Sequence, residues 1–123
     1  MIGIFNDNYP PIMDGVGFTA QNYAYWLHEK GNDVAVITPY APNSQEIIES
    51  SPHPIYRYVS IPIPFRAPYR FGMPYIDVPF MHQWWKMQFE LVHTHCPFTS
   101  GHLAYRAARR QHIPMVATFH SKY

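Results

Sequence analysis

Residues 2–38, IGIFNDNYPPIMDGVGFTAQNYAYWLHEKGNDVAVIT, contain two apolar runs with a turn-rich segment and an amphipathic segment between them. The first run, residues 2–5, has the length of a short strand, and residues 6–11 are turn formers that neither a strand nor a helix accommodates. The second run, residues 33–38, is apolar enough to be a strand buried on both faces. A strand–helix–strand unit of this kind is wound right-handed and belongs to a parallel sheet.

The amphipathic segment predicts the helix of this unit. Four of its residues recur at spacings of three and four and form one side of a helix: Ala20, Tyr23, Ala24 and Leu27. Thr19 is the predicted N-cap, and Gly31 supplies the stop.

The segment Asp14-Gly15-Val16-Gly17 precedes this helix and is a candidate binding loop. A loop at the carboxyl end of the first parallel strand opens toward the crevice where doubly wound sheets bind ligands. Gly15 and Gly17 would let the backbone approach a ligand closely, and the free N–H groups of a helix start favour an anion. The alternative is a loop whose glycines merely permit the turn. A nicotinamide dinucleotide site is disfavoured, because the loop is long and the second strand ends on Thr38-Pro39 rather than on an acid.

Composition limits the classes of function. The 123 residues form one domain at most, and a net charge of +1 gives no indication of nucleic-acid binding. Charged residues make up 14% and aromatic residues 17%, so part of the surface is expected to be covered by a partner, a second domain or a membrane. A single cysteine excludes an intrachain disulfide. Without a signal peptide or an apolar stretch of spanning length, the chain is predicted to be cytoplasmic, with peripheral membrane attachment left open.

The middle of the chain has nine prolines between residues 39 and 79, which exclude a long helix there. We expect one helical turn over 44–50, a strand over 56–61 and an irregular excursion over 62–79. In the excursion, Arg66 and Arg70 alternate with aromatic residues. Arginine beside aromatic rings grips anionic headgroups, phosphates or sugar faces. A long loop packed on its own aromatics would look the same.

The last third predicts two helices and two further strands. A helix over 80–89 would present four residues along one side: Met81, Trp84, Trp85 and Gln88. Two adjacent tryptophans cannot both face a narrow core, so one is expected at the surface. A second helix starts at Thr99 or Ser100 and keeps its three arginines on the solvent side. The complete set of predicted strands lies near residues 2–6, 33–38, 56–61, 91–95 and 115–119, the last of them buried.

His93, His95, Cys96 and His120 could be taken for a zinc site, because thiolate and imidazole suit that metal. Alternate residues of a strand share a face, so His93 and His95 are expected side by side. Such a pair is common on strands without metal, and no metal site is predicted. A Cys96 nucleophile paired with His95 is weaker still, because neighbouring residues on a strand point to opposite faces.

Four segments, in order, carry a resemblance to a known family: residues 2–11 with 14–17, residues 27–34 with 37–39, residues 91–98 with Gly101, and residues 113–120. On these segments the sequence resembles the N-terminal domain of the family-4-like glycosyltransferases of GT-B fold, retaining enzymes that use nucleotide sugars. It looks most similar to members that glycosylate lipids such as diacylglycerol or phosphatidylinositol. The resemblance implies an α/β fold, a Rossmann-like three-layer sandwich with a parallel sheet, which is the N-terminal half of GT-B.

The resemblance also implies site residues. Gly15, Val16 and Gly17 would face the donor diphosphate, and His120 would line the reaction centre as the catalytic residue. The residues assigned to the acceptor are Tyr9 and Lys122, together with Arg66 and Arg70 of the excursion.

In the family, the nucleotide-sugar site belongs mostly to a C-terminal domain. Residues 1–123 are therefore predicted to be a partial N-terminal domain that is inactive alone and needs no cofactor. Its expected partners are a nucleotide-sugar donor and a lipid or sugar acceptor, with no nucleic acid. Two other classes compete: a stand-alone sugar- or phosphate-binding module, and a zinc hydrolase using His93, His95 and His120.

Overall fold

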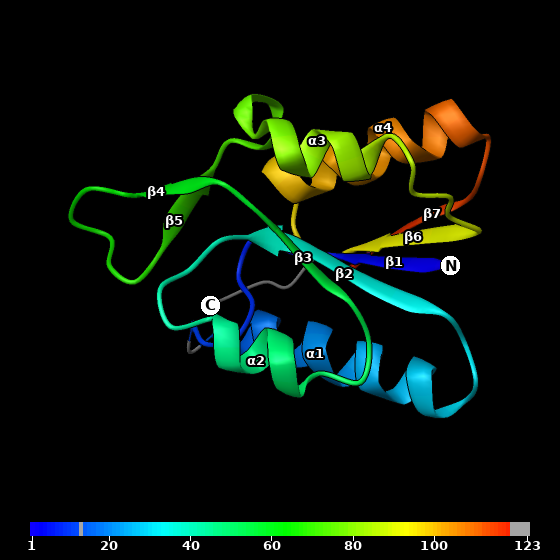
Figure 1. Ribbon diagram of the computed structural model, residues 1–123, viewed down its shortest axis with the longest axis horizontal. Coiled ribbons are helices and arrows are strands. Elements are labelled where there is room, and N and C mark those ends of the chain that lie inside the picture. Colours follow the sequence, from blue (N-terminus) through cyan, green and yellow to red (C-terminus); the bar gives the residue numbers. More distant parts are fainter. Residues whose placement is uncertain (13, 119–123) are drawn as a thin grey trace.

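The computed structural model describes residues 1–12 and 14–118 (Figure 1). Its centre is a parallel sheet of five strands in the order β3–β2–β1–β6–β7. These strands are β1 (Ile2–Phe5), β2 (Val34–Pro39), β3 (Ile55–Tyr58), β6 (Leu91–Thr94) and β7 (Met115–Ala117). The predicted positions of the strands are confirmed, with ends that differ by up to three residues.

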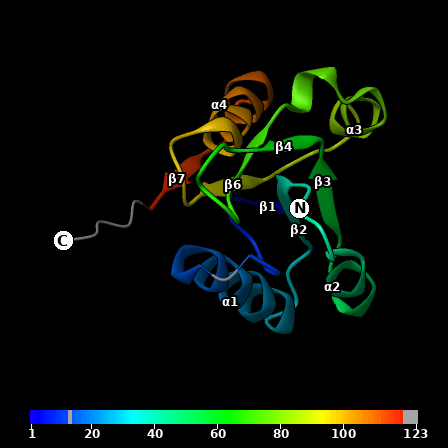
Figure 2. The ribbon, with the colours of Figure 1, turned by 90° about the vertical axis from the view of Figure 1, so that its left-hand side faces the viewer.

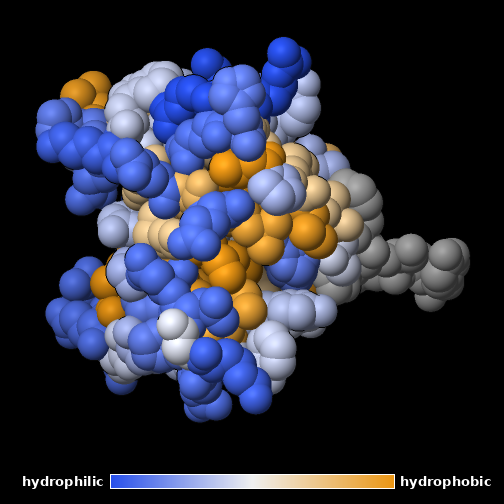
Figure 3. Space-filling model, turned by 90° about the vertical axis from the view of Figure 1, so that its right-hand side faces the viewer, coloured by the Kyte–Doolittle hydropathy of each residue, from blue (hydrophilic) through white to orange (hydrophobic). Residues whose placement is uncertain are grey.

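Helices cover both faces of the sheet, as the predicted three-layer sandwich requires (Figures 1 and 2). Helices α1 (Gly15–Glu29) and α2 (Gln45–Ser50) lie on one face. Helices α3 (Val78–Trp84) and α4 (Thr99–Gln111) lie on the other. Seen from the side where the strands begin, apolar residues form a band between two hydrophilic groups (Figure 3). Among the described residues, none of the helices is long and apolar enough to cross a membrane.

The alternation of side chains along β1 divides the core into two clusters. Ile4 packs with Ala20, Ala24 and β2 residues on the α1 side, whereas Phe5 packs with α3 and α4. Every residue of β2 is buried, so the prediction of a strand covered on both faces is confirmed.

Helix α1 begins earlier than predicted. Its N-cap is Asp14, whose Oδ1 accepts a hydrogen bond from the Val16 N–H at 2.9 Å. The prediction of Thr19 as N-cap is wrong, because its hydroxyl lies inside the helix and donates to the Gly15 carbonyl. Asp14 has the extended backbone that an N-cap needs and a carboxylate that suits the helix dipole. Gly31 ends the helix as predicted, with φ of +89°.

The excursion after β3 is more regular than predicted. Strand β4 (Ser60–Pro62) pairs antiparallel with β5 (Arg70–Gly72) as a second, two-stranded sheet, so residues 56–61 are not one strand. A 3₁₀ turn, Pro74–Ile76, then leads into α3. Gly72 is needed for this arrangement, because a Cβ there would lie 2.3 Å from the Tyr58 ring. We call residues 60–72 the hairpin.

Two predictions about burial need correction. The predicted helix over 80–89 is wrong in its second half, because α3 ends at Trp84 and Gln88 lies beyond it. Within α3 the buried residues are Phe80 and Trp84, four residues apart, rather than the predicted side that includes Trp85. One tryptophan is exposed as expected, since Trp84 is 3% and Trp85 58% exposed. Strand β7 was predicted to be buried, but all three of its residues are exposed because it is the edge strand of the described sheet.

Candidate functional site

The candidate site lies where the parallel strands end. The chain leaves β1 and β2 at this edge, and the hairpin projects from the same end of the molecule (Figure 1). Folds of this class bind ligands in the crevice outside the carboxyl ends of their strands.

Asp14 joins the start of α1 to the hairpin. Its Oδ1 caps the helix through the Val16 N–H, and its Oδ2 accepts a hydrogen bond from the Tyr69 hydroxyl at 3.0 Å. The pKa of Tyr69 is raised, first by this hydrogen bond and then by the negative charge of Asp14. The side chain therefore stays a neutral hydroxyl at the rim of the crevice.

The predicted diphosphate loop, Gly15 to Gly17, forms the first turn of α1. The Val16 N–H is already bonded to Asp14, and Gly17 packs so closely on the preceding loop that a Cβ would lie 2.7 Å from the Asn8 carbonyl oxygen. Gly15 is exposed, and a Cβ there would meet nothing within 4 Å. Gly15 is thus the residue of the three whose backbone a ligand reaches directly. The role of the loop in donor binding stays a prediction.

Tyr9 lies in the core, at 1% exposure, under the Arg57 side chain. Arg57 donates hydrogen bonds to the carbonyl oxygens of Pro39 and Pro10 and so ties the loop after β1 to the end of β2. Burial raises the pKa of Tyr9 and lowers that of Arg57 to about 10. Tyr9 is too buried in this structure to contact an acceptor. Its predicted role in acceptor binding would therefore be indirect, through the position of the loop after β1.

Asp7 connects three segments, and the sequence analysis missed it. Its carboxylate accepts hydrogen bonds from the Ser100 N–H at 2.9 Å, the Cys96 thiol at 3.0 Å and the Tyr58 hydroxyl at 3.4 Å. The first of these bonds satisfies a backbone donor at the start of α4. The available signal was an acid among turn formers directly after a buried strand, at the edge where α4 begins.

Cys96 is poorly suited to nucleophilic chemistry. Burial, followed by the charge of Asp7, raises the pKa of its thiol to about 12, so it stays protonated at neutral pH. Its thiol donates a hydrogen bond to the Asp7 carboxylate at 3.0 Å.

His93 and His95 lie side by side as predicted, with ring centroids 4.2 Å apart. Both rings pack against Tyr23 of α1, at 5.3 and 5.4 Å. His93 Nε2 also lies 2.9 Å from the Thr118 hydroxyl beyond β7. Within residues 1–12 and 14–118, no group of three His, Cys, Asp or Glu side chains is arranged to hold a metal ion. His120 and Lys122 lie outside the described residues, and their roles stay predictions.

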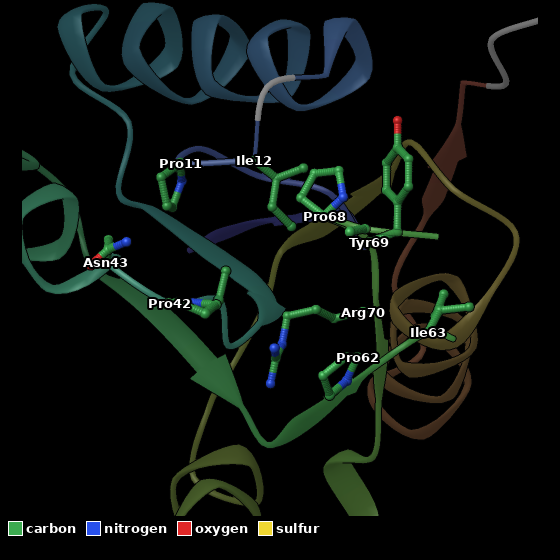
Figure 4. A pocket seen from close by; sticks show the side chains of 11 residues that line it. Pro11, Ile12, Pro42, Asn43, Pro62, Ile63, Pro68, Tyr69 and Arg70 are labelled. Carbon is green, nitrogen blue, oxygen red and sulfur yellow. The ribbon is translucent and has the colours of Figure 1, made fainter. Parts of the chain in front are cut away.

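A cavity of about 420 Å³ opens beside the start of α1 (Figure 4). It lies between the loops that follow β1 and β2 and the hairpin. Its lining is mainly apolar: Pro11, Ile12, Ala41, Pro42, Asn43, Pro62, Ile63, Ala67, Pro68, Tyr69 and Arg70.

Of the two arginines predicted to bind the acceptor, Arg70 is fixed at the cavity and Arg66 is not. Arg70 is held at the cavity by hydrogen bonds from Nε and Nη2 to Ser60, at 2.7 and 3.1 Å, and it lies over the Tyr40 ring. Arg66 is exposed on the loop of the hairpin and does not line the cavity. The structure thus brings Arg70 and Tyr69 to the same cavity and leaves Arg66 outside it.

Comparison with known proteins identifies relatives. Residues 13–123 match the profile of Glycosyltransferase Family 4. The alpha-monoglucosyldiacylglycerol synthase of Acholeplasma laidlawii is 31% identical over 122 residues, 99% of this chain and 30% of that protein. The enzyme of the same name from Streptococcus pneumoniae is 25% identical over 126 residues, 99% of this chain and 27% of that protein. The chain therefore spans less than a third of these relatives.

The fold also has a counterpart among solved structures. The crystal structure of Acinetobacter baumannii MurG superposes with a TM-score of 0.63 at 14% identity, over 96% of this chain and 34% of that one. At this identity the likeness concerns the fold alone. It confirms the predicted Rossmann-like sandwich with a parallel sheet.

Proposed function

Because the chain belongs to Glycosyltransferase Family 4, we propose that it forms the acceptor-side part of a retaining enzyme that transfers a sugar from a nucleotide-sugar donor to a lipid acceptor. The proposed protein has a second, C-terminal domain that binds most of the donor, and residues 1–123 are inactive without it. Its proposed location is the cytoplasm, at the inner face of a membrane, because a lipid acceptor resides in a bilayer.

The cavity beside α1 is the observation that carries this proposal. Its prolines, isoleucines and alanines suit the apolar part of a lipid, and Tyr69 and Arg70 supply polar groups at its wall. A hydroxyl attached to a lipid held here would lie near the crevice edge. Both relatives named above are called synthases of a glucosylated diacylglycerol, which agrees with an apolar acceptor.

The chemistry requires that the charge developing on the leaving diphosphate be stabilised. In this chain, the exposed backbone of Gly15 at the start of α1 is suited to that task, since helix starts present N–H donors and a positive dipole end. The Val16 N–H already donates to Asp14. The other hydrogen-bond donors that the diphosphate needs are therefore assigned to the proposed second domain. His120 is proposed to hydrogen-bond a sugar hydroxyl at the reaction centre.

The test uses the whole protein with a panel of nucleotide sugars and dioctanoylglycerol as a dispersed acceptor. We expect a glycosylated lipid whose anomeric configuration, read by NMR, matches that of the donor. An inverted product would contradict the retaining mechanism. Binding of sugars or phosphates with no transfer to any lipid would instead favour the stand-alone binding module.

A further inference from the structure

Helix α1 has an uncharged outer surface. Residues 15–27 contain no Lys, Arg, Asp or Glu. The buried residues of the helix are Gly17, Ala20 and Ala24, whereas Tyr23 is 41% and Trp26 56% exposed. A surface helix ordinarily carries charged and polar residues opposite its buried face. The outer surface of α1 differs, because it presents aromatic rings to the solvent.

These rings belong to an open hollow of about 410 Å³ on the helix. Its lining consists of four residues of α1, one turn apart or adjacent: Thr19, Asn22, Tyr23 and Trp26. None of the four lines the cavity beside the hairpin. Tyr23 contacts His93 of β6, so the hollow lies toward that side of the sheet (Figure 2). We call the four lining residues the α1 face.

The two rings of the α1 face are already positioned in the free protein. Tyr23 packs against both His93 and His95 of β6. Trp26 lies one turn further along the same helix, with the Lys30 ammonium 5.7 Å from the centroid of its ring. Binding groups held on a rigid element lose little conformational freedom when a ligand arrives.

Polar groups lie beside the rings. The Asn22 side chain is exposed, and its amide offers both N–H donors and a carbonyl oxygen. The Thr19 hydroxyl donates to the Gly15 carbonyl, which leaves its oxygen available as an acceptor. A purely apolar ligand would cover these groups without offering them a partner, at a cost in free energy. The lining therefore fits a ligand that has both an apolar face and hydroxyl groups.

Charge and size narrow the class of ligand further. No charged residue lines the hollow, whereas Arg70 lines the cavity beside the hairpin, so an anion has no matching cation on the α1 face. A specific protein–protein interface takes roughly 20–30 residues a side, far more than the four residues here. A neutral pyranose ring fits, because its C–H face stacks on an aromatic ring and its hydroxyl groups bond to amides and hydroxyls.

We infer that the α1 face binds a neutral hexopyranose, with the sugar ring stacked on Trp26 and its hydroxyl groups bonded to Asn22 and Thr19. The site lies outside the crevice at the strand ends and outside the apolar cavity. It therefore gives the protein a second place for a sugar, and its existence does not depend on the proposed transfer reaction.

The test is an NMR titration of the ¹⁵N-labelled chain with methyl β-D-glucoside, whose equatorial ring substituents leave C–H groups on both faces. We expect the indole N–H resonance of Trp26, assigned with Trp26→Phe, to shift in a saturable way. The expected dissociation constant is on the order of 1 mM, as for a small ligand with few contacts. The indole resonances of Trp84 and Trp85 should not move, because α3 lies on the other face of the sheet.

Substitutions connect the shift to the proposed contacts. Trp26→Ala should weaken binding roughly tenfold through loss of the stacking surface, and Asn22→Ala about fivefold through loss of one hydrogen bond. The matched control is Trp85→Ala, which removes a tryptophan of nearly equal exposure, 58%, from the other face of the sheet. This variant should bind the glucoside like the parent. Circular dichroism shows that each variant is folded.

Three results would overturn the inference. They are a Trp26 resonance that stays in place well above the expected dissociation constant, an equal loss of binding in Trp85→Ala, and displacement of the glucoside by inorganic phosphate. Self-association in a sedimentation experiment, abolished by Trp26→Ala and unaffected by the glucoside, would also overturn it, since the α1 face would then bind a second copy of the chain.

Catalysis separates this inference from the proposed function. In the whole protein, Trp26→Ala should leave the kcat for dioctanoylglycerol unchanged, because Trp26 does not line the cavity assigned to the acceptor. A protein that binds the glucoside at Trp26 but glycosylates no lipid would overturn the proposed function and leave the sugar site standing. Transfer to lipid without binding at Trp26 would overturn the sugar site alone.

Discussion

The Tyr69 hydroxyl donates a hydrogen bond to the Asp14 carboxylate, 55 residues earlier in the chain, at 3.0 Å. This bond holds the hairpin against the start of α1 and thereby closes one wall of the apolar cavity. The same carboxylate caps the helix, so one side chain fixes both a helix end and a long connection.

We expect Asp14→Ala to lower the free energy of unfolding by about 1 kcal/mol, the usual cost of a lost N-cap. Tyr69→Phe should cost less than that, because it removes one solvent-accessible hydrogen bond. In the whole protein, Tyr69→Phe should raise the KM for the lipid with little change in kcat. Urea titration and steady-state kinetics measure these effects, with Tyr105→Phe as the control. A Tyr69→Phe variant with unaltered KM would show that the bond does not shape the cavity.

Asp7 should matter more for stability than any exposed acid. Asp7→Ala leaves the Ser100 N–H, the Cys96 thiol and the Tyr58 hydroxyl without their shared acceptor, at a cost of about 2–3 kcal/mol. Asp33→Ala, at an exposed position, is the control and should change the free energy of unfolding by less than about 0.5 kcal/mol. Equal unfolding midpoints in urea for the two variants would contradict the role assigned to Asp7.

The two glycines of the candidate loop should respond differently to alanine. Gly17→Ala puts a Cβ 2.7 Å from the Asn8 carbonyl oxygen and should destabilise the chain by about 2 kcal/mol despite the better helix propensity of alanine. Gly15→Ala meets open space and should change stability by less than about 0.5 kcal/mol. If Gly15 contacts the donor diphosphate, Gly15→Ala in the whole protein lowers kcat/KM without loss of melting temperature. Unchanged kcat/KM would remove Gly15 from the donor site.

Stability should fall on mild acidification because of His53. This ring is 4% exposed, contacts Tyr25 and His28, and its burial lowers the pKa. Below the ordinary histidine pKa of about 6.5, the unfolded chain therefore binds a proton that the folded chain resists, so stability declines as pH falls through that value. Above it, the contribution is constant.

Urea unfolding at pH 7.5 and pH 5.5 measures this loss. His53→Gln should reduce the difference between the two pH values, whereas His112→Gln, at an exposed position, should leave it unchanged. A pH difference that survives in His53→Gln would assign the effect to other groups.

Periodicity predicted most of the fold, because β2 is mainly apolar and buried along its whole length and α1 and α4 carry regular buried stripes. It failed at the hairpin, where the pairing of Ser60–Pro62 with Arg70–Gly72 depends on contacts between segments and not on local pattern. The sequence pattern also placed the start of α1 at Thr19 instead of Asp14. An N-cap is decided by backbone geometry, and the two glycines between Asp14 and Thr19 made that geometry hard to predict from the sequence.

The candidate site was predicted less completely than the fold. The strand–helix–strand topology correctly predicted that Gly15 and Gly17 lie where the strands end. The close packing of Gly17 on the Asn8 carbonyl depends on tertiary contacts and could not be predicted from the sequence. Tyr9 carries no sequence signal that distinguishes a buried ring from a binding residue. Asp7 was missed because its three partners are distant in sequence.

His120 and His93 give the sharpest test of the reaction centre. His120 comes after β7 in the sequence and is proposed to hydrogen-bond a sugar hydroxyl as charge develops. In the whole protein, His120→Ala should therefore lower kcat roughly a hundredfold, the scale of one lost transition-state hydrogen bond, with little change in melting temperature. His93 contacts Thr118, His95 and Tyr23, so His93→Ala should lower the melting temperature before it lowers activity. An active His120→Ala variant, or a His93→Ala variant that is stable but inactive, would move the chemistry from the end of β7 to β6.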